Sequence, residues 1–457
     1  MIVMKFGGTS VEDARAIERS AGIVKGRLEH KPAVVVSAMA KVTDQLLAMA
    51  RAAGAGDRKT ALKLCRALQE RHYNTAGELL GTALFTQFHG DLGADFETLE
   101  ELLRGIAAVG ELTPRTTDYV SAFGEILSSK IVAAAFSALG MDSALVDSRE
   151  WLVTDTAHMR AAPLFEETNQ RLQSKVAPLI AAGKVPVMGG FIGATKAGIT
   201  TTIGRGGSDY SAAIVGAGLS AERIEIWTDV DGMMTTDPRL VPEARRIKVI
   251  SFDEAAELAY FGAKVLHPAT VLPAVQKNIP VYVLNSRNPD CEGTRITARA
   301  PRCRNFFKAI AVKKRITIVD VAAPRMQLAH GFLSSIFAAF DRHRVAVDVV
   351  STSEVSVSLT VDSNESIPPL AADLAKLADV KYEGRKAIVC LVGENLRDTP
   401  GIAARVFGEL ADVKIRMISQ GASEINLTFV VEEDTVSEIV RRLHKTFFSD
   451  LDPEVFA

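Results

Sequence analysis

Short apolar segments alternate with longer helical ones over the first 300 residues, and this alternation restricts the possible folds more than any other feature. Most of the short segments are continuous apolar runs, which is typical of strands buried on both faces of a sheet. Helical stretches between such strands predict an α/β fold, a mostly parallel open sheet with helices on both faces. The predicted strands are residues 2–6, 33–37, 143–147, 185–189, 224–228 and 281–285.

Residues 59–140 interrupt the alternation with a mostly helical excursion. Leu99, Leu102, Leu103 and Ile106 follow helical spacing, so we expect this segment to form a lid or an element that packs between subunits. A chain of 457 residues is too long for one compact core, which predicts two to four domains.

From about residue 309 the chain contains two copies of one unit at a constant offset of 70 residues. Each copy reads as a strand, a glycine-led amphipathic helix, a strand, a turn and a strand. A repeat of this size indicates a small α+β module that is used twice. The corresponding pairs are Gly331 and Gly401, Phe337 and Phe407, Ser353 and Ser423, Glu354 and Glu424, and Val361 and Val431.

Composition and charge exclude several classes of protein. A net charge of −2 gives no reason to expect a nucleic acid or an anionic membrane as partner. No apolar run approaches the roughly 18 residues of a membrane span. The four cysteines are scattered without metal-ligand spacing, so we interpret them as reduced thiols of a cytoplasmic protein.

The segment 202–213 combines a cation, glycines and a carboxylate on one turn before an apolar helix. Arg205 can grip a carboxylate through two parallel hydrogen bonds, and Gly206 and Gly207 allow a ligand to approach the backbone closely. Helix starts also attract anions. The alternative is a plain helix cap by Ser208 or Asp209 after a glycine turn.

The motif KFGGTS at residues 5–10 brings Lys5, Gly7 and Gly8 to the end of the first predicted strand. An ammonium group, bare backbone amides and a following helical stretch at 11–27 together suit a phosphate group. The order differs from the P-loop, because the lysine precedes the glycines. The alternative is a tight connection between a strand and a helix.

Two further motifs also place polar side chains where a ligand could bind, and each has a structural alternative. Ser37 and Thr43 come just after a predicted strand, where ligands bind in open α/β sheets, although both could instead cap a helix. Glu125 closes the motif SAFGE, at what we interpret as a glycine break before an apolar helix. There it would be either a partner of the helix dipole or a ligand for an amine.

The last two motifs are rich in polar groups that suit a nucleotide. Thr228 and Asp229 end a predicted strand, and the loop after them continues to Arg239. Lys264 lies beside a glycine in FGAKVLHPAT, which makes it a second candidate cation for phosphate. A solvated turn is the alternative for the first of these motifs.

Together these motifs closely resemble those of aspartate kinases, within the amino acid kinase superfamily, and the resemblance covers essentially the whole chain. It rests on KFGGTS, SAFGE, GRGGSDYSAA, WTDVDG with TTDPR, and FGAKVLHPAT. The repeat resembles the paired ACT (ferredoxin-like) modules of the monofunctional, lysine-sensitive type. The resemblance implies a kinase domain at 1–300, with a substrate lobe at about 1–190 and a nucleotide lobe at about 191–300. It also implies ACT modules at 309–383 and 386–457, with strand 307–313 as a candidate to complete the second.

The implied reaction is transfer of a phosphoryl group from ATP to the β-carboxylate of L-aspartate, which opens the pathway to lysine, threonine and methionine. Mg²⁺ would sit on phosphate oxygens and water, without a protein ligand that we can name. By resemblance the catalytic residues are Lys5 and Asp209; the aspartate-binding residues are Ser37, Thr43, Glu125, Arg205 and Ser208; and the ATP-binding residues are Gly7, Gly8, Thr228, Asp229, Arg239 and Lys264.

The ACT modules imply feedback regulation by an amino acid, with lysine as the first candidate, and a homodimer formed through these modules or a tetramer. The implied effector-binding residues are Met326, Asp348, Thr352, Ser353 and Glu354. Two alternatives stay open: an amino-acid sensor on a degenerate kinase scaffold, and a related kinase for another acidic substrate. The joint presence of Lys5, Arg205 and Asp209 argues against the sensor.

Overall fold

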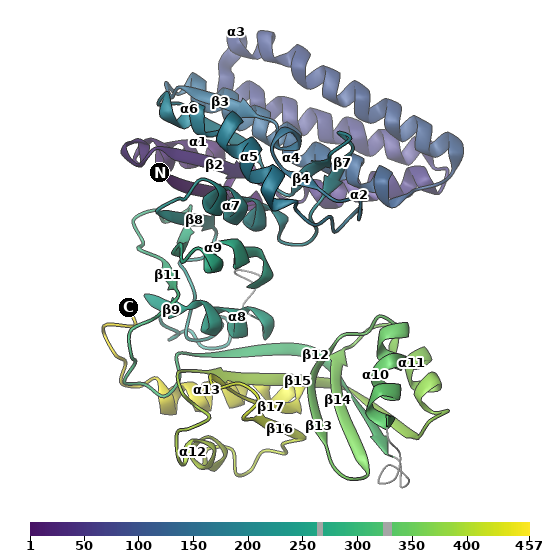
Figure 1. Cartoon of the computed structure of the whole chain (residues 1–457), viewed down its shortest axis with the longest axis vertical. Coiled ribbons are helices and arrows are strands. Elements are labelled where there is room, and N and C mark those ends of the chain that lie inside the picture. Colours follow the sequence, from purple (N-terminus) through teal and green to yellow (C-terminus); the bar gives the residue numbers. More distant parts are fainter. Residues whose placement is uncertain (263–267, 323–330) are drawn as a thin grey trace. The chain divides into compact units, whose positions relative to one another are not determined.

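The computed structural model describes residues 1–262, 268–322 and 331–457 (Figure 1). The chain divides into two compact units, the first comprising Met1–Met233 and Val265–Ala300 and the second Met234–Lys264 and Pro301–Ala457. Residues 234–264, which we assigned to the nucleotide lobe, therefore belong to the compact unit that contains the repeat. The boundaries of the functional domains stay a prediction.

The first unit is built on a sheet with the strand order β3-β5-β2-β1-β8-β10-β11. All neighbours pair in parallel except β11, which is antiparallel to β10. The six strands expected from the apolar runs are present to within one residue at each end, so the predicted α/β class is confirmed. The strands are β1 (Ile2–Phe6), β2 (Pro32–Val36), β3 (Ser143–Val146), β5 (Val185–Gly189), β8 (Arg223–Thr228), β10 (Val281–Asn285) and β11 (Thr294–Thr297).

Helices cover both faces of this sheet. Met4 and Phe6 belong to a buried cluster with apolar side chains of α1, α2, α3 and α4. Val3 points to the opposite face, because successive strand residues alternate. There a Cβ built on Gly216 of α7 would lie 2.7 Å from Ile224 and 3.8 Å from Val3, so the glycine lets α7 approach the sheet closely. The helices are α1 (Ala14–Lys25), α2 (Val42–Gly54), α3 (Arg58–Val109), α4 (Pro114–Ala138), α5 (Phe165–Lys175), α6 (Ala177–Ala181), α7 (Gly207–Gly218) and α9 (Leu272–Gln276).

The predicted helical excursion is present as α3 and α4. Helical geometry breaks inside α3 at Gly81, where φ is +65°. The rings of His72 and Phe96 lie 5.7 Å apart across this break, so the two halves of α3 fold back on each other. In the described part of the chain, α4 is the one helix long and apolar enough to cross a membrane, and 83% of that window is buried. Its apolar sequence is accounted for by this core position.

One expectation for α4 was wrong. Glu125 does not follow a glycine break, because α4 runs without interruption from Pro114 to Ala138. Gly124 is required for a different reason, since a Cβ at this position would lie 2.8 Å from the Cβ of Ala38. The glycine allows the loop after β2 to contact the helix.

A second, small sheet leads into the turn before α7. It has the order β4-β6-β7 and was not predicted, because its strands are two to four residues long and rich in threonine. Short 3-10 turns complete the first unit at Gly8–Ser10, Leu28–His30, Ser148–Glu150 and Pro268–Val271. The strands of the small sheet are β4 (Val153–Thr154), β6 (Ile192–Thr195) and β7 (Thr200–Thr202).

The second unit confirms the repeat. Its main sheet has the order β13-β14-β12-β15-β17-β16, and the strands of the two copies begin 70 residues apart. Gly331 and Gly401 both precede their helices with positive φ, of +84° and +77°. The elements are β9 (Val249–Ser251), α8 (Phe252–Tyr260), β12 (Ala309–Ala322), α10 (Phe332–Arg342), β13 (Val347–Thr352), β14 (Ser356–Asp362), α11 (Ile367–Leu374), β15 (Asp379–Val392), α12 (Ile402–Gly408), β16 (Met417–Gln420), β17 (Asn426–Glu432), a 3-10 turn (Glu433–Thr435) and α13 (Val436–Phe447).

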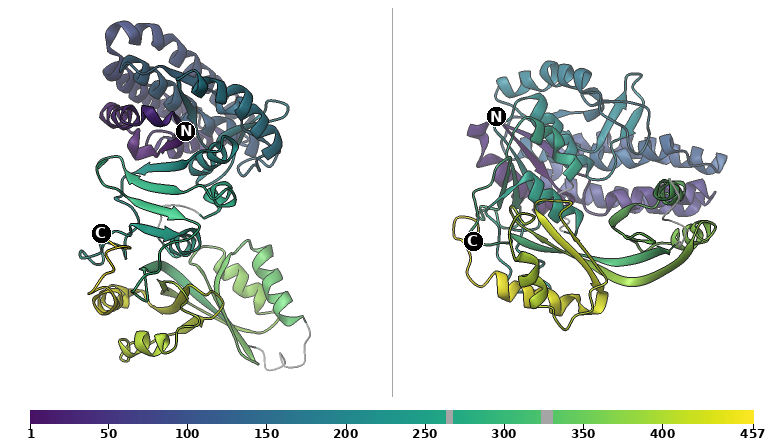
Figure 2. Two further views of the ribbon diagram at one scale, coloured as in Figure 1. Left: turned by 60° about the vertical axis from the view of Figure 1, so that its left-hand side comes forward. Right: turned by 60° about the horizontal axis from the view of Figure 1, so that its bottom comes forward.

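The two modules share their central strands. β12 and β15 are antiparallel along their whole length, from the pair Ala309 and Val392 to the pair Ala322 and Asp379 (Figures 1 and 2). The second half of β12 also pairs with β14 of the first module, and β15 pairs with β17 of the second. Each copy therefore completes its sheet with a strand of the other.

Candidate active site

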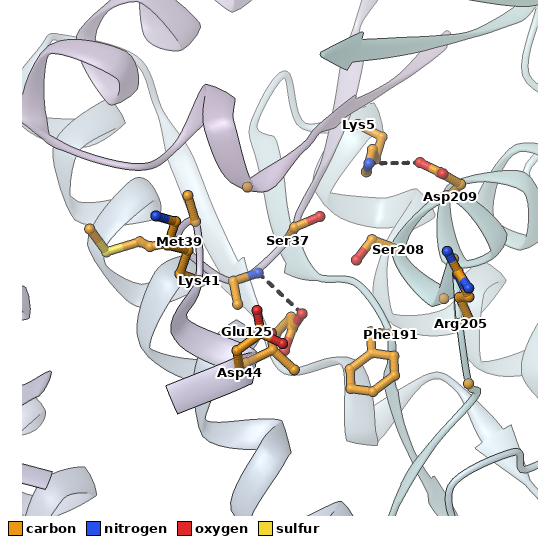
Figure 3. Close-up of a pocket in the computed structure, with 17 residues that line it drawn as sticks. Lys5, Ser37, Met39, Lys41, Asp44, Glu125, Phe191, Arg205, Ser208 and Asp209 are labelled. Atoms are coloured by element: carbon orange, nitrogen blue, oxygen red, sulfur yellow. Dashed lines mark hydrogen bonds and ion pairs between the residues drawn. The ribbon is translucent and has the colours of Figure 1, made fainter. Parts of the chain in front are cut away.

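A cavity of about 350 Å³ lies beside the turn that follows β1. Five chain segments far apart in sequence converge on it (Figure 3). They are the end of β1 with its following turn, the loop after β2 with the start of α2, α4, the loop between β5 and β6, and the turn before α7 with the first residues of that helix. Its size suits one small ligand or part of a larger one. The residues that line it are Lys5, Gly8, Ser37, Ala38, Met39, Ala40, Lys41, Thr43, Asp44, Glu125, Phe191, Gly204, Arg205, Gly206, Gly207, Ser208 and Asp209.

The two predicted catalytic residues form an ion pair in this cavity. Lys5 Nζ lies 2.7 Å from Asp209 Oδ1, and the two side chains are only 10% and 15% exposed. Parallel pairing of β1 and β8 fixes the strand that carries Lys5, and Asp209 lies in the first turn of α7. An ammonium group beside a helix N-terminus attracts anions, so this corner suits a phosphate group.

The turn before α7 is built on left-handed glycines rather than on a side-chain cap. Gly206 is the N-cap residue with a φ of +73°, and neither Ser208 nor Asp209 caps the helix. The alternative of a plain side-chain cap is therefore wrong. Arg205 is exposed, and its side chain forms no ion pair within residues 1–262, 268–322 and 331–457, which leaves its guanidinium available to a ligand.

Glu125 is almost fully buried on the opposite wall of the cavity, with 3% of its surface exposed. Its Oε1 accepts a hydrogen bond from the backbone N–H of Ala38, over 3.1 Å. Its Oε2 has no hydrogen-bond partner among the described residues. Burial raises the pKa of Glu125 to about 8, and the Ala38 hydrogen bond and the charge of Lys5 oppose this shift only in part. A buried carboxyl with one free oxygen is suited to a cationic ligand group.

The loop after β2 presents Ser37 to the cavity, and the first turn of α2 presents Thr43. Neither residue caps a helix, because the N-cap of α2 is Lys41, which has a φ of +67° and makes no side-chain cap. The alternative function that we considered for these two hydroxyls is thus excluded. Lys41 and Asp44 also line the cavity, and the motif analysis did not single them out.

A buried carboxylate that the sequence analysis missed fixes the turn around Arg205. Asp118 is 1% exposed and accepts hydrogen bonds from Thr202 Oγ1 at 2.6 Å and from the backbone N–H of Met159 at 3.0 Å. His158 Nδ1 lies 2.7 Å from the same carboxylate. Asp118 precedes Glu125 by seven residues, or two helical turns, so both carboxylates lie on one face of α4. This spacing of seven residues from Glu125 is the sequence feature that could have identified Asp118 as a site residue.

The predicted nucleotide residues are only partly brought together. Gly8 lines the cavity, and the backbone N–H of Gly7 donates to the carbonyl of Trp227 over 2.9 Å. Thr228 and Asp229 follow at the end of β8, beside β1, and do not line the cavity. Arg239 lies in the second unit and pairs with Asp237 over 2.7 Å, and Lys264 lies outside the described residues.

Four of the five predicted effector residues lie in described parts of the first module of the second unit. Asp348 accepts from Lys313 Nζ at 2.8 Å and from the hydroxyl of Tyr260 at 2.9 Å. Thr352 ends β13, and Ser353 and Glu354 follow in an exposed turn. Met326 lies outside the described residues.

No group of three or more histidine, cysteine, aspartate or glutamate side chains that could hold a metal ion occurs in the ranges that the structure describes. The expectation of a magnesium ion held by phosphate oxygens and water is not tested by this observation.

Comparison with protein families matches residues 1–285 to the amino acid kinase family and residues 389–447 to an ACT domain. The chain is 36% identical over 461 residues to lysine-sensitive aspartokinase 3 of Escherichia coli strain K12, covering 98% of this chain and 99% of that protein. It is 37% identical over 466 residues to the chloroplastic aspartokinase 1 of Arabidopsis thaliana, covering 98% of this chain and 80% of that protein.

Solved structures of aspartokinases also match this chain. The chain resembles E. coli aspartokinase III in complex with aspartate and ADP, with a TM-score of 0.85, 36% identity and coverage of 98% of this chain and 100% of that one. A second structure of that enzyme, in complex with lysine and aspartate, matches with a TM-score of 0.85 and 35% identity, over 98% of this chain and 99% of that one. The chain therefore belongs to the amino acid kinase family and, within it, to the aspartokinases.

Proposed function

We propose that this chain transfers the γ-phosphoryl group of ATP to the β-carboxylate of L-aspartate, which yields 4-phospho-L-aspartate and ADP. The observation that carries the proposal is one cavity that combines the Lys5–Asp209 ion pair, the exposed guanidinium of Arg205 and the free oxygen of Glu125. These groups match, in turn, a phosphoryl group, a carboxylate and an ammonium group.

The chemistry needs electrostatic stabilisation rather than a base. The β-carboxylate has an ordinary pKa of about 3.9 and is already ionised at neutral pH. Its attack on phosphorus requires that the repulsion between two anions be cancelled and that the reacting atoms be aligned. Lys5 steadies the phosphoryl group in transfer, and Asp209 holds the lysine ammonium in place. The backbone amide of Gly8, which lines the cavity, adds a donor on the same side, while Gly7 shapes the turn through its hydrogen bond to Trp227.

The amino acid end of aspartate is bound by residues of opposite charge. Arg205, with Ser208 beside it, holds the α-carboxylate, and Glu125 Oε2 accepts from the α-ammonium group. Ser37 supplies a hydroxyl group from the loop after β2, and Thr43 supplies one from the first turn of α2. Because the carboxylate and ammonium contacts come from different walls, the side chain of the substrate is directed toward Lys5.

Thr228, Asp229, Arg239 and Lys264 line the nucleotide position in this proposal. Mg²⁺ would be held there by phosphate oxygens and water rather than by a protein ligand, and it would neutralise charge on the transferred group. Lysine is the proposed feedback effector, and Met326, Asp348, Thr352, Ser353 and Glu354 bind it. The named E. coli relative is lysine-sensitive, which supports this choice. A cytoplasmic homodimer through the ACT modules is the proposed assembly, and a tetramer is the alternative.

Trapping of the acyl phosphate with hydroxylamine tests the reaction. We expect hydroxamate with ATP and aspartate, and little with glutamate or acetylglutamate offered in parallel. A preference for another acid would overturn the substrate. Absence of any product, with amino acid binding retained, would favour the degenerate sensor. Parallel reactions with lysine, threonine and methionine identify the effector.

A further inference from the structure

Arg71, in the helical excursion, contacts two loops of the candidate active site from outside the cavity. Its Nη1 donates to the backbone carbonyl of Ala40 at 2.9 Å, and its Nη2 donates to the backbone carbonyl of Glu12 at 3.0 Å. One planar guanidinium therefore joins the loop after β2 to the turn after β1. Arginine forms such forked contacts well, because its donors are held in a rigid plane.

Both loops carry groups that the proposed reaction needs. Ala40 lies two residues after Ala38, whose N–H donates to Glu125, and its own N–H donates to the carbonyl of Gly8 over 3.1 Å. Contact between the loops is close, since a Cβ on Gly8 would lie 3.0 Å from the carbonyl oxygen of Ala38. The next residue, Lys41, adopts a left-handed φ of +67°, a conformation that surrounding contacts must hold.

The side chain of Glu12 restrains the same turn from a second direction. Its carboxylate accepts from Arg287 over 3.0 Å, while its carbonyl accepts from Arg71. The turn is thus held between two arginines, of which only Arg71 also reaches the loop after β2. Loss of Arg71 would remove this side-chain link and leave the spacing of the two loops to the backbone hydrogen bond from Ala40 to Gly8, with each loop's own fold intact.

Arg71 is also accessible to small solutes. It lines a second cavity of about 380 Å³, which is surrounded mostly by exposed and acidic side chains. A small cation can therefore enter the space that the side chain would vacate. The other lining residues are Glu12, Asp13, Ala67, Glu70, Asn74, Thr75 and Glu78.

We propose that Arg71 is a positioning residue for phosphoryl transfer: it holds the turn that follows Lys5 and the loop that contacts Glu125 at the spacing that the reaction requires. This inference rests on the proposed function. It also gives the helical excursion a defined part in the reaction, through a residue that touches neither substrate.

The test compares Arg71→Ala, Arg71→Lys and the control Arg66→Ala, which removes a 71% exposed arginine of the same helix. Loss of two hydrogen bonds from a charged donor should lower kcat/KM for aspartate about 10- to 100-fold, with a fall in kcat. Arg71→Lys should be intermediate, because a lysine cannot reach both carbonyls as a fork. Arg66→Ala should match the wild type.

Chemical rescue distinguishes positioning from folding. Low concentrations of guanidinium chloride should restore several-fold activity to Arg71→Ala, while potassium chloride at equal ionic strength should not. Unchanged kinetics in Arg71→Ala would overturn the inference, and so would a loss of activity with a lowered Tm and no rescue. If the wild type itself forms no hydroxamate from aspartate, the proposed function falls and the inference with it.

Discussion

Lys5 Nζ lies 2.7 Å from Asp209 Oδ1, although the two residues are 204 positions apart in the chain. Both side chains are largely buried, so the pair is only weakly screened by solvent and salt. This contact joins the two motifs that most strongly indicate anion binding. It places a cation at the edge of the cavity without leaving it as an isolated buried charge.

Removal of either partner should stop the reaction. We expect Lys5→Ala and Asp209→Ala to lower kcat by at least 100- to 1000-fold, because preorganised charge at the phosphoryl group is lost. Hydroxamate formation under saturating aspartate and ATP measures this. Lys184→Ala, which removes an exposed partner of Asp142, is the control. Retention of near wild-type kcat in both variants would exclude the assigned roles.

Arg205 should act mainly on affinity for aspartate. Arg205→Ala is expected to raise KM for aspartate about 10- to 100-fold with a smaller effect on kcat, since a charged hydrogen-bonded contact to the α-carboxylate is lost. Arg205→Lys should recover little of this loss, because lysine cannot bind a carboxylate through two parallel bonds. The control is the neighbouring Arg160→Ala, whose residue does not line the cavity. Equal changes in the KM of ATP and aspartate would contradict the assignment.

Binding of aspartate should release the proton that Glu125 carries in the free protein. Its folded-state pKa of about 8 means that much of it is protonated at pH 7, and an incoming ammonium group should displace that proton. Calorimetry of aspartate binding at pH 7, in buffers of different ionisation enthalpy, should show net release of up to one proton. Proton uptake or no proton exchange would show that Glu125 is not the ammonium ligand.

The same raised pKa gives a stability prediction with a defined sign. The folded chain retains the proton above pH 4.5, where the unfolded chain has lost it, so stability falls as pH rises from about 4.5 to 8. Glu125→Gln should therefore be more stable than the wild type at pH 8, by on the order of 3–5 kcal/mol. Thermal unfolding should show this gap closing as the pH approaches 4.5. A stability difference between Glu125→Gln and the wild type that is the same at all pH values would show that the Glu125 proton is not linked to folding.

The carboxylate of Asp118 should control the geometry of the Arg205 turn. Thr202→Val removes the hydroxyl at 2.6 Å from Asp118 while keeping the shape of the side chain. We expect KM for aspartate to rise about three- to tenfold, as one charge-assisted hydrogen bond is lost, with KM for ATP nearly unchanged. Steady-state kinetics measures both values. Equal weakening for the two substrates would indicate a general loss of structure instead.

Asp348 should be needed for feedback. Asp348→Asn is expected to weaken inhibition by lysine at least tenfold while leaving uninhibited kcat unchanged, because the carboxylate that would bind an ammonium group is removed. Asp362→Asn is the matched control, since Asp362 also pairs with Lys313 but is 64% exposed. Dose–response curves for inhibition by lysine compare the two variants with the wild type. Unaltered inhibition of Asp348→Asn would show that this residue does not belong to the effector site.

The sequence predicted those helices, strands and repeats whose pattern of residue types is complete within a short stretch of the chain. Continuous apolar runs identified β1 and β10 without error, and the 70-residue offset identified the two modules. The break expected at Gly124 was wrong because a glycine inside a helix can serve close packing, here against Ala38, and a single sequence does not show the neighbour. The strands of the small sheet were missed because two to four residues carry too little periodicity.

By itself, the sequence determined the alternation of strands and helices, the repeat and the motifs that place this chain among the aspartokinases, since these depend on residue type and spacing. Only the tertiary structure decided which charges meet. The pairing of Lys5 with Asp209, the free oxygen and raised pKa of Glu125, and the hold of Asp118 on the Arg205 turn depend on distance and on loss of solvent. Both quantities arise when distant segments pack together, and neither can be read from the residues taken in order.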